Sequence, residues 1–148
     1  MVIQKDERIN ILKTSNKYIN CIEDHKALID KKGLCWMARI GRDVNSQPIV
    51  NKNNYLFLYQ RGALYLAHSK EIIKEQPSNG FPDSYKKYVF SGRMIPTEYL
   101  LLDFLEPIAI NILDFLRYEG NHRIVSETIT RSPKAYVVTR AIEDIDLF

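Results

Sequence analysis

Two β-rich runs between residues 55 and 69 constrain the fold more than any other part of this sequence. The runs YLFLYQ and ALYLAH flank Arg61-Gly62, and this pattern predicts a tight β-hairpin. Arg fits poorly at a turn position that needs a positive φ, so a loop one residue wider is the alternative. With a two-residue loop both faces of the hairpin are apolar, and we therefore expect it to lie inside a sheet. One face would carry Tyr55, Phe57, Tyr59, Leu64, Leu66 and His68, and the other Leu56, Leu58, Gln60, Ala63, Tyr65 and Ala67.

Before the hairpin, the pattern predicts one helix and one strand. Residues 23–32 carry apolar side chains typical of a short helix, and Gly33 is well placed to end it. Residues 34–40 alternate as a strand does, with Trp36 and Ala38 on one face.

After the hairpin, we expect strands at residues 88–95 and 135–139 and helices at residues 108–118 and 123–130. Residues 99–106, YLLLDFLE, suit either a buried strand or a helix, and we favour the strand. Together these elements predict an α+β fold. It would be a single domain over residues 1–148, with a curved, mostly antiparallel sheet and flanking helices.

The charge of the chain is unevenly distributed. Its net charge is +3 at pH 7, but residues 1–100 carry 16 basic and 10 acidic groups, whereas residues 101–148 carry 5 and 8. This asymmetry is compatible with a basic face that binds nucleic acid. Hydrophobic residues make up 45% of the chain and charged residues 26%, which is typical of a globular domain. No uncharged run reaches the length of a membrane span, so we expect no membrane association.

The two cysteines, Cys21 and Cys35, lack the spacing of a zinc site. We find no export signal and no Asn-x-Ser/Thr acceptor, which favours reduced thiols in a cytoplasmic protein. We therefore expect neither a disulfide nor a bound metal.

Standard catalytic motifs are missing from the sequence. It contains no G-x-S-x-G, no G-x-G-x-x-G, no phosphate-binding G-x4-G-K-S/T and no H-E-x-x-H. The carboxylate pairs at residues 23–24 and at Asp103 and Glu106 resemble solvated edges, and the three histidines share no spacing of a ligand set or a base. These observations favour a protein that is not an enzyme and needs no cofactor.

Aromatic and basic residues lie near one another at three places. Aromatic rings can stack on a base while Arg and Lys hold the neighbouring phosphates. The three groups are Trp36 with Arg39 and Arg42, Tyr59 and Tyr65 with Arg61, and Tyr85 and Tyr88 with Lys86, Lys87 and Arg93.

The order of these features resembles the PUA-like superfold, in particular domains of the EVE and YTH type. The resemblance covers about residues 30–140. It rests on the strand with Trp36, the stretch NKNNYLFLY that ends at Tyr59, the following strand at residues 63–68, and the segment FPDSY before a strand, a helix and a last strand. The usual Gly-Asp before the Tyr-ended strand is Asn53-Asn54 in this chain.

This resemblance implies a PUA-like pseudo-barrel that reads nucleic acid. Such domains bind DNA or RNA and can hold one modified base, flipped out of its stack, in an aromatic pocket. Similar modules supply specificity in prokaryotic restriction and defence systems, where a partner protein of the system would bind as well. The implied base-binding residues are Trp36, Tyr59 and Tyr65. The implied contacts to the nucleic-acid backbone are Arg39, Arg42, Arg61, Lys86, Lys87 and Arg93.

A second hypothesis remains open. The dense apolar segment at residues 99–116 could leave a surface for a protein partner, so the chain could also be a non-enzymatic interaction or structural component of a larger complex. Salt dependence separates the two, because binding to phosphates weakens steeply with salt.

Overall fold

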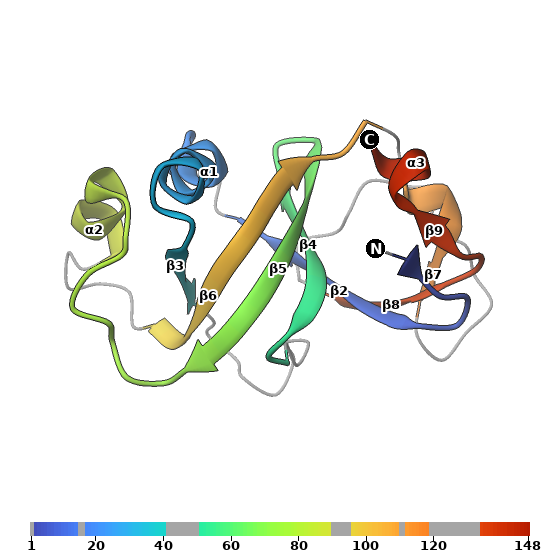
Figure 1. Cartoon of the computed structure of the whole chain (residues 1–148), viewed down its shortest axis with the longest axis horizontal. Coiled ribbons are helices and arrows are strands. Elements are labelled where there is room, and N and C mark those ends of the chain that lie inside the picture. Colours follow the sequence, from blue (N-terminus) through green and yellow to red (C-terminus); the bar gives the residue numbers. More distant parts are fainter. Residues whose placement is uncertain (1, 15–16, 41–50, 90–95, 110–111, 119–133) are drawn as a thin grey trace.

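Seven strands form one open sheet in the order β3-β6-β5-β4-β2-β8-β7 (Figure 1). The computed structural model describes residues 2–14, 17–40, 51–89, 96–109, 112–118 and 134–148. The pairing is antiparallel except between β2 and β4, which run parallel. The fold is therefore α+β with a mostly antiparallel sheet, as predicted. The strands are β2 (Arg8–Lys13), β3 (Cys35–Ile40), β4 (Asn54–Gln60), β5 (Ala63–Ile73), β6 (Pro96–Pro107), β7 (Leu116–Tyr118) and β8 (Lys134–Val138).

Short helices and a second, two-stranded sheet complete the described structure. The small sheet pairs β1 (Val2–Ile3) with β9 (Ile142–Glu143). The helices are α1 (Cys21–Lys32), α2 (Asp83–Val89), the 3-10 helix η2 (Ile112–Phe115) and α3 (Asp144–Leu147). Among the helices described, none is long and apolar enough to cross a membrane.

The β4–β5 hairpin lies at the centre of the large sheet, as its two apolar faces predicted. Gln60 pairs with Ala63, so the loop contains two residues. Arg61 has φ 51° and Gly62 has φ 87°, the signs of a type I′ turn. The wider loop is therefore wrong, because the strand register holds Arg61 in the left-handed region despite its side chain.

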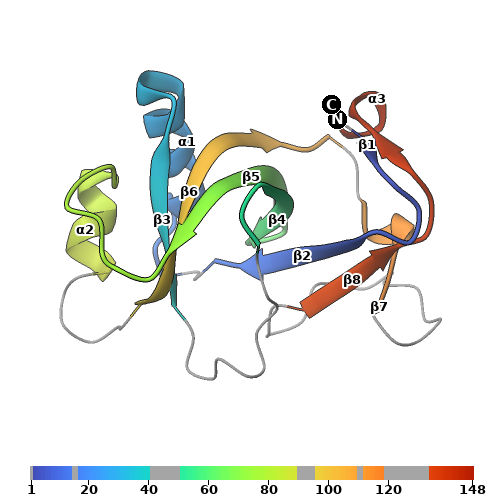
Figure 2. The same ribbon diagram turned by 60° about the horizontal axis from the view of Figure 1, so that its bottom comes forward.

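Each face of the hairpin belongs to a different core. On one face, Phe57 and Leu66 pack with Ile3, Ile142 and Leu147 from the small sheet and α3. On the other face, the side chains of β4, β5 and β6 pack against α1. This second core contains Leu56, Leu58, Ala67, Leu100, Leu102 and Leu105 from the strands, with Ile22 and Ile29 from the helix. Figure 2 shows β5 and β6 arching between these two covers.

The outer edge of β3 is closed by the segment that leads into α2. The Trp36 N–H donates to the Gly80 carbonyl over 2.8 Å. The Tyr85 hydroxyl accepts from the Ala38 N–H at 3.1 Å and donates to the Ala38 carbonyl at 3.0 Å. These contacts occupy the hydrogen-bonding groups that an edge strand would otherwise offer to another chain.

Several predicted elements agree with the structure. Helix α1 covers the predicted residues 23–32 and ends at Gly33, whose φ is 84°. Strand β6 confirms the strand preferred for residues 99–106, and β8 confirms the last strand. The strand containing Trp36 is β3, with the predicted alternation of faces.

Two predicted elements are wrong. Residues 83–89 form α2, so the strand predicted at 88–95 does not begin where expected, and residues 90–95 lie outside the described part. The helix predicted at 108–118 is replaced by a short 3-10 turn and by β7, because the fully buried Leu116 pairs with Val138. The helix predicted at 123–130 lies outside the described residues. Strands β1, β2 and β9 were not predicted.

Both cysteines are free and buried, as expected of unpaired thiols. Burial raises the pKa of Cys21 and of Cys35 to about 12. A thiol that stays protonated near neutral pH is a weak nucleophile, so we assign both residues to packing.

The hairpin turn can be tested with two matched substitutions. Arg61→Asn should raise the free energy of unfolding by about 0.5 kcal/mol, because Asn tolerates positive φ better than Arg. Gly62→Ala should lower it by about 1 kcal/mol through backbone strain alone, since an added Cβ meets nothing within 4 Å. Urea denaturation measures both changes, and a loss of stability in Arg61→Asn would contradict the type I′ assignment.

Candidate functional site

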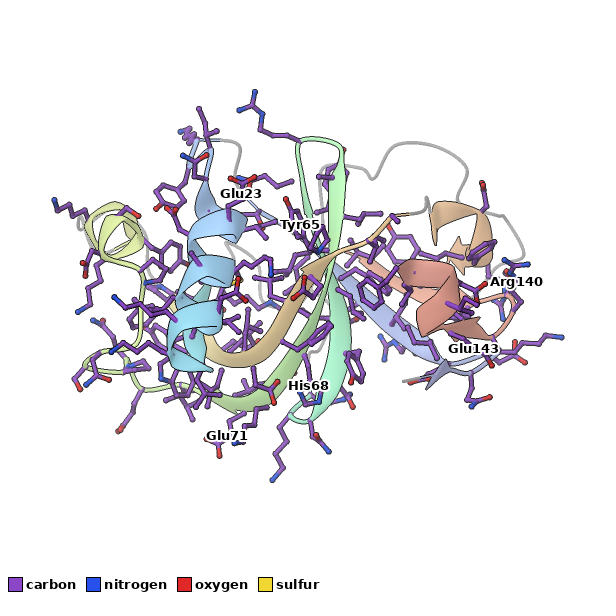
Figure 3. All side chains as sticks on the ribbon, turned by 45° about the horizontal axis from the view of Figure 1, so that its top comes forward. Glu23, Tyr65, His68, Glu71, Arg140 and Glu143 are labelled. Atoms are coloured by element: carbon purple, nitrogen blue, oxygen red, sulfur yellow. The ribbon has the colours of Figure 1, made fainter. Side chains whose placement is uncertain are left out.

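The three aromatic residues predicted to bind a base lie in separate parts of the structure. Tyr59 pairs with Leu64 and packs against the core under the small sheet, whereas Tyr65 packs against the core under α1. Figure 3 shows Tyr65 close to α1 and Glu23. Trp36 is half-buried in a third cluster, where an added Cβ at Gly80 would lie 2.8 Å from its Cδ1. The structure therefore does not bring these three rings into one pocket.

The predicted phosphate contacts are also dispersed. Arg39 forms an ion pair of 2.8 Å with Glu98, so its charge is balanced within the sheet. Arg61 is exposed at the hairpin turn, and Lys86 and Lys87 lie in the last turn of α2. The remaining two, Arg42 and Arg93, lie outside the described residues.

Four other aromatic side chains make a continuous series on the opposite end of the hairpin. We call Tyr55, His68, Phe104 and Phe148 the aromatic strip. The ring centroids lie 4.8 Å apart for Tyr55 and His68, 6.4 Å for Tyr55 and Phe104, and 6.2 Å for Phe104 and Phe148. The outer two rings are open to solvent, with Tyr55 39% and Phe148 53% exposed.

The sheet register explains why three of these rings meet. Tyr55 of β4 pairs with His68 of β5, and His68 pairs with Phe104 of β6. Residues that face each other across strands lie on the same face, so their side chains come into contact. The sequence already placed Tyr55 and His68 on one face, whereas no sequence signal connected them with Phe148.

A hydrogen bond fixes the His68 ring. Its Nδ1 lies 2.6 Å from Oδ1 of Asp103, and their side chains are 15% and 33% exposed. A carboxylate only accepts, so Nδ1 carries the proton and Nε2 keeps its lone pair in the neutral ring. In the described part of the chain, His68 has no hydrogen-bond partner at Nε2.

Asp103 reaches His68 because the β5–β6 ladder is irregular here. His68 pairs with Phe104 and Ser69 with Leu102, which leaves Asp103 as an extra residue on β6. Lys70 is the extra residue on β5 one step later. Such bulges turn side chains out of the regular alternation and occur often beside functional sites.

Three of the four carboxylates expected at solvated edges are partly exposed and also make hydrogen bonds to other side chains. Besides the bond from Asp103 to His68, Glu106 accepts a hydrogen bond of 3.0 Å from Lys26. Asp24 accepts from the hydroxyls of Tyr18 and Ser84, the latter over 2.9 Å. Lys26 and Glu106 are 80 residues apart and Asp24 and Ser84 are 60 apart, so local charge patterns do not reveal these contacts.

His25 differs from His68 because it is fully buried. Its Nδ1 lies 2.6 Å from the Cys21 carbonyl oxygen, and its ring contacts the Tyr85 ring edge-on at 4.4 Å between centroids. Burial lowers the pKa of His25 to about 4, so the ring is neutral near pH 7. A ring with no access to solvent has a structural role here.

Comparisons with known proteins give no relatives for this chain: no family model, no curated protein and no solved structure matches it. Within the described residues, no group of three or more His, Cys, Asp and Glu side chains could hold a metal ion. We take the aromatic strip with the His68–Asp103 pair as the candidate site, because it joins two solvent-exposed rings to a histidine whose orientation is fixed by a carboxylate.

The packing of Trp36 beneath Gly80 can be tested with another matched pair of substitutions. Gly80→Ala should cost about 2–4 kcal/mol of unfolding free energy, because backbone strain at φ +89° adds to a clash with the indole. Gly33→Ala, at φ +84° with nothing within 4 Å, should cost only about 1 kcal/mol. Trp36 is the only tryptophan, so its fluorescence should change in Gly80→Ala alone. Equal losses in both variants would contradict this packing.

Neutral His25 predicts a pH dependence of stability. Its pKa is lowered from 6.5 to about 4, so between these values the unfolded chain binds a proton that the folded protein does not. The free energy of unfolding should therefore fall by about 3 kcal/mol from this group as pH drops through that window, and should lose nothing further from it below pH 4. Urea denaturation from pH 7 to pH 4 measures the loss. The His25→Leu variant is the control, and an equally steep loss in that variant would refute the assignment.

Proposed function

We propose that this protein binds single-stranded nucleic acid and that the aromatic strip stacks on unpaired bases. The observation that carries the proposal is the contact series of four rings, of which Tyr55 and Phe148 are open to solvent. Base stacking on an aromatic side chain contributes about 1–3 kcal/mol and tolerates any sequence, because every base has a π-face. Neighbouring rings of the strip are inclined by 56°, 80° and 72°, so each exposed ring can stack on one unpaired base, whereas the bases of a duplex are already stacked.

Positive charge near the strip supports the same function. Lys52 and Lys70 are both exposed, and the segments that carry them are joined where the Asn53 N–H donates to the Ser69 carbonyl over 2.6 Å. These two lysines can contact phosphates on either side of a base held by Tyr55. The excess of basic groups in residues 1–100 favours an approach of this region to nucleic acid.

The resemblance to PUA-like domains extends the proposal to a reader of one extruded, modified base in a restriction or defence system. Such a reader binds DNA or RNA with one base extruded from its stack. Extruding the base costs a few kcal/mol of unstacking free energy, which stacking of that base on the protein offsets. This finer proposal includes two further features of that family. One is a sheet arranged as a pseudo-barrel, and the other is contact between Trp36 and the extruded base. Binding of a protein partner instead of nucleic acid is the outcome that would replace it.

Substitution of Tyr55 tests the stacking surface. Tyr55→Ala should weaken binding to single-stranded DNA and RNA by about 1–3 kcal/mol, measured by fluorescence anisotropy at low salt. Leu34→Ala is the matched control, because Leu34 is 38% exposed, close to the 39% of Tyr55, and lies outside the strip. Equal affinities for both variants, or no binding by the wild-type protein at low salt, would refute the proposal.

Substitution of the lysines tests the phosphate contacts independently. Lys52→Ala and Lys70→Ala should each lower the dependence of log K on log salt by about 0.7, the effect of one phosphate contact on a single strand. Affinity should fall by a similar factor for all sequences, since phosphates carry no sequence information. An unchanged salt dependence in both variants would place the bound strand elsewhere.

A further inference from the structure

We propose that His68 is a general base that cleaves single-stranded RNA, with the ribose 2′-hydroxyl as the nucleophile. This inference rests on the proposed function, because the aromatic strip must first hold the strand. It starts from the His68–Asp103 pair, which stacking on bases does not require.

The pair has the features of a general base. The bond of 2.6 Å to Asp103 fixes the ring orientation and leaves the lone pair on Nε2. The imidazole is partly exposed, so a substrate hydroxyl can reach it, unlike the ring of His25. Asp103 also stabilises the imidazolium that forms when Nε2 accepts a proton.

The position of His68 within the strip defines the substrate class. Its ring lies 4.8 Å from that of Tyr55, between centroids, so a nucleotide whose base stacks on Tyr55 has its sugar near the imidazole. No hydroxyl or thiol of the described residues is hydrogen-bonded to His68, and the proposal therefore takes the nucleophile from the substrate. RNA supplies one as its 2′-hydroxyl, whereas DNA has none.

The reaction is an internal transesterification that needs no added oxidant, metal or nucleotide. The 2′-oxygen forms a bond to the adjacent phosphorus while its proton passes to Nε2 of His68. The bond from phosphorus to the 5′-oxygen breaks, and that oxygen takes a proton from water. The imidazolium returns its proton to the hydroxide left behind. The products are a 2′,3′-cyclic phosphate and a 5′-hydroxyl end.

The test uses one oligonucleotide sequence as single-stranded RNA and as single-stranded DNA, with EDTA present throughout. The chain of residues 1–148 should bind both and cleave only the RNA, and mass spectrometry should identify the cyclic phosphate. His68→Ala should lower the cleavage rate at saturating RNA about 10²–10⁴-fold, a comparison that weaker RNA binding does not affect. Added imidazole should restore part of that rate, an effect that a purely structural role for His68 would not give.

Asp103 is the positioning residue of the pair. Asp103→Asn should lower kcat about 10²–10⁴-fold with KM nearly unchanged, because the amide no longer holds the required tautomer. Tyr55→Ala should instead raise KM, since stacking holds the substrate. Thermal melts followed by circular dichroism confirm that each variant is folded.

The outcomes separate this inference from the proposed function. RNA that is bound but stays intact would overturn the inference and leave the binding function standing. Cleavage by the His68→Ala preparation as fast as by the wild-type protein would reveal a contaminating nuclease. That result would also overturn the inference and leave the binding function standing. Failure to bind either strand at low salt would overturn both.

Discussion

The β4–β5 hairpin carries apolar side chains on both faces, and the rest of the structure is arranged to cover them. Leu56 and Leu58 are excluded from water under α1, and Phe57 under the small β1–β9 sheet and α3. Burying a large apolar side chain contributes about 1.5–3 kcal/mol, so leaving either face open would cost a large part of the about 5–15 kcal/mol by which a domain is stable. A central strand pair of this kind needs other elements packed on both faces. In this chain α1 packs on one face, and β1, β9 and α3 from the two ends of the chain pack on the other.

One edge of the large sheet, strand β3, is closed to the addition of another strand. Gly80 and Tyr85 occupy the outward hydrogen-bonding groups of Trp36 and Ala38 on β3, so an extended segment cannot add to this edge. A ligand at the β3 edge would therefore contact side chains rather than the strand backbone. The exposed Tyr55 lies beyond the packed part of the hairpin face, where side chains are available for stacking.

The elements that the sequence revealed are those fixed by local pattern. The hairpin faces, α1 with Gly33, and β6 all follow from alternation, helical spacing or a capping glycine. Helix α2 was missed, and so was the hydrogen bond between the Tyr85 hydroxyl in this helix and Ala38, because the two residues are 47 positions apart in the chain. The His68–Asp103 pair was missed for a similar reason, since its members are 35 residues apart and meet only through a bulge. The aromatic residues chosen for a base pocket are in fact divided among three clusters, because strand alternation sends Tyr59 and Tyr65 to opposite faces.

The curvature of the sheet and the geometry of the candidate site have a common origin. Strands β5 and β6 must bend to contact both covers, and extra residues at bulges are the ordinary means of bending paired strands (Figure 2). A bulge also interrupts the strict alternation of faces, and Asp103 is released by it from the series of buried leucines on β6. The bend that the two cores require thus places the Asp103 carboxylate beside His68, where the hairpin face opens to solvent. The oriented imidazole of His68 next to the exposed Tyr55 ring is therefore a consequence of how the sheet is bent.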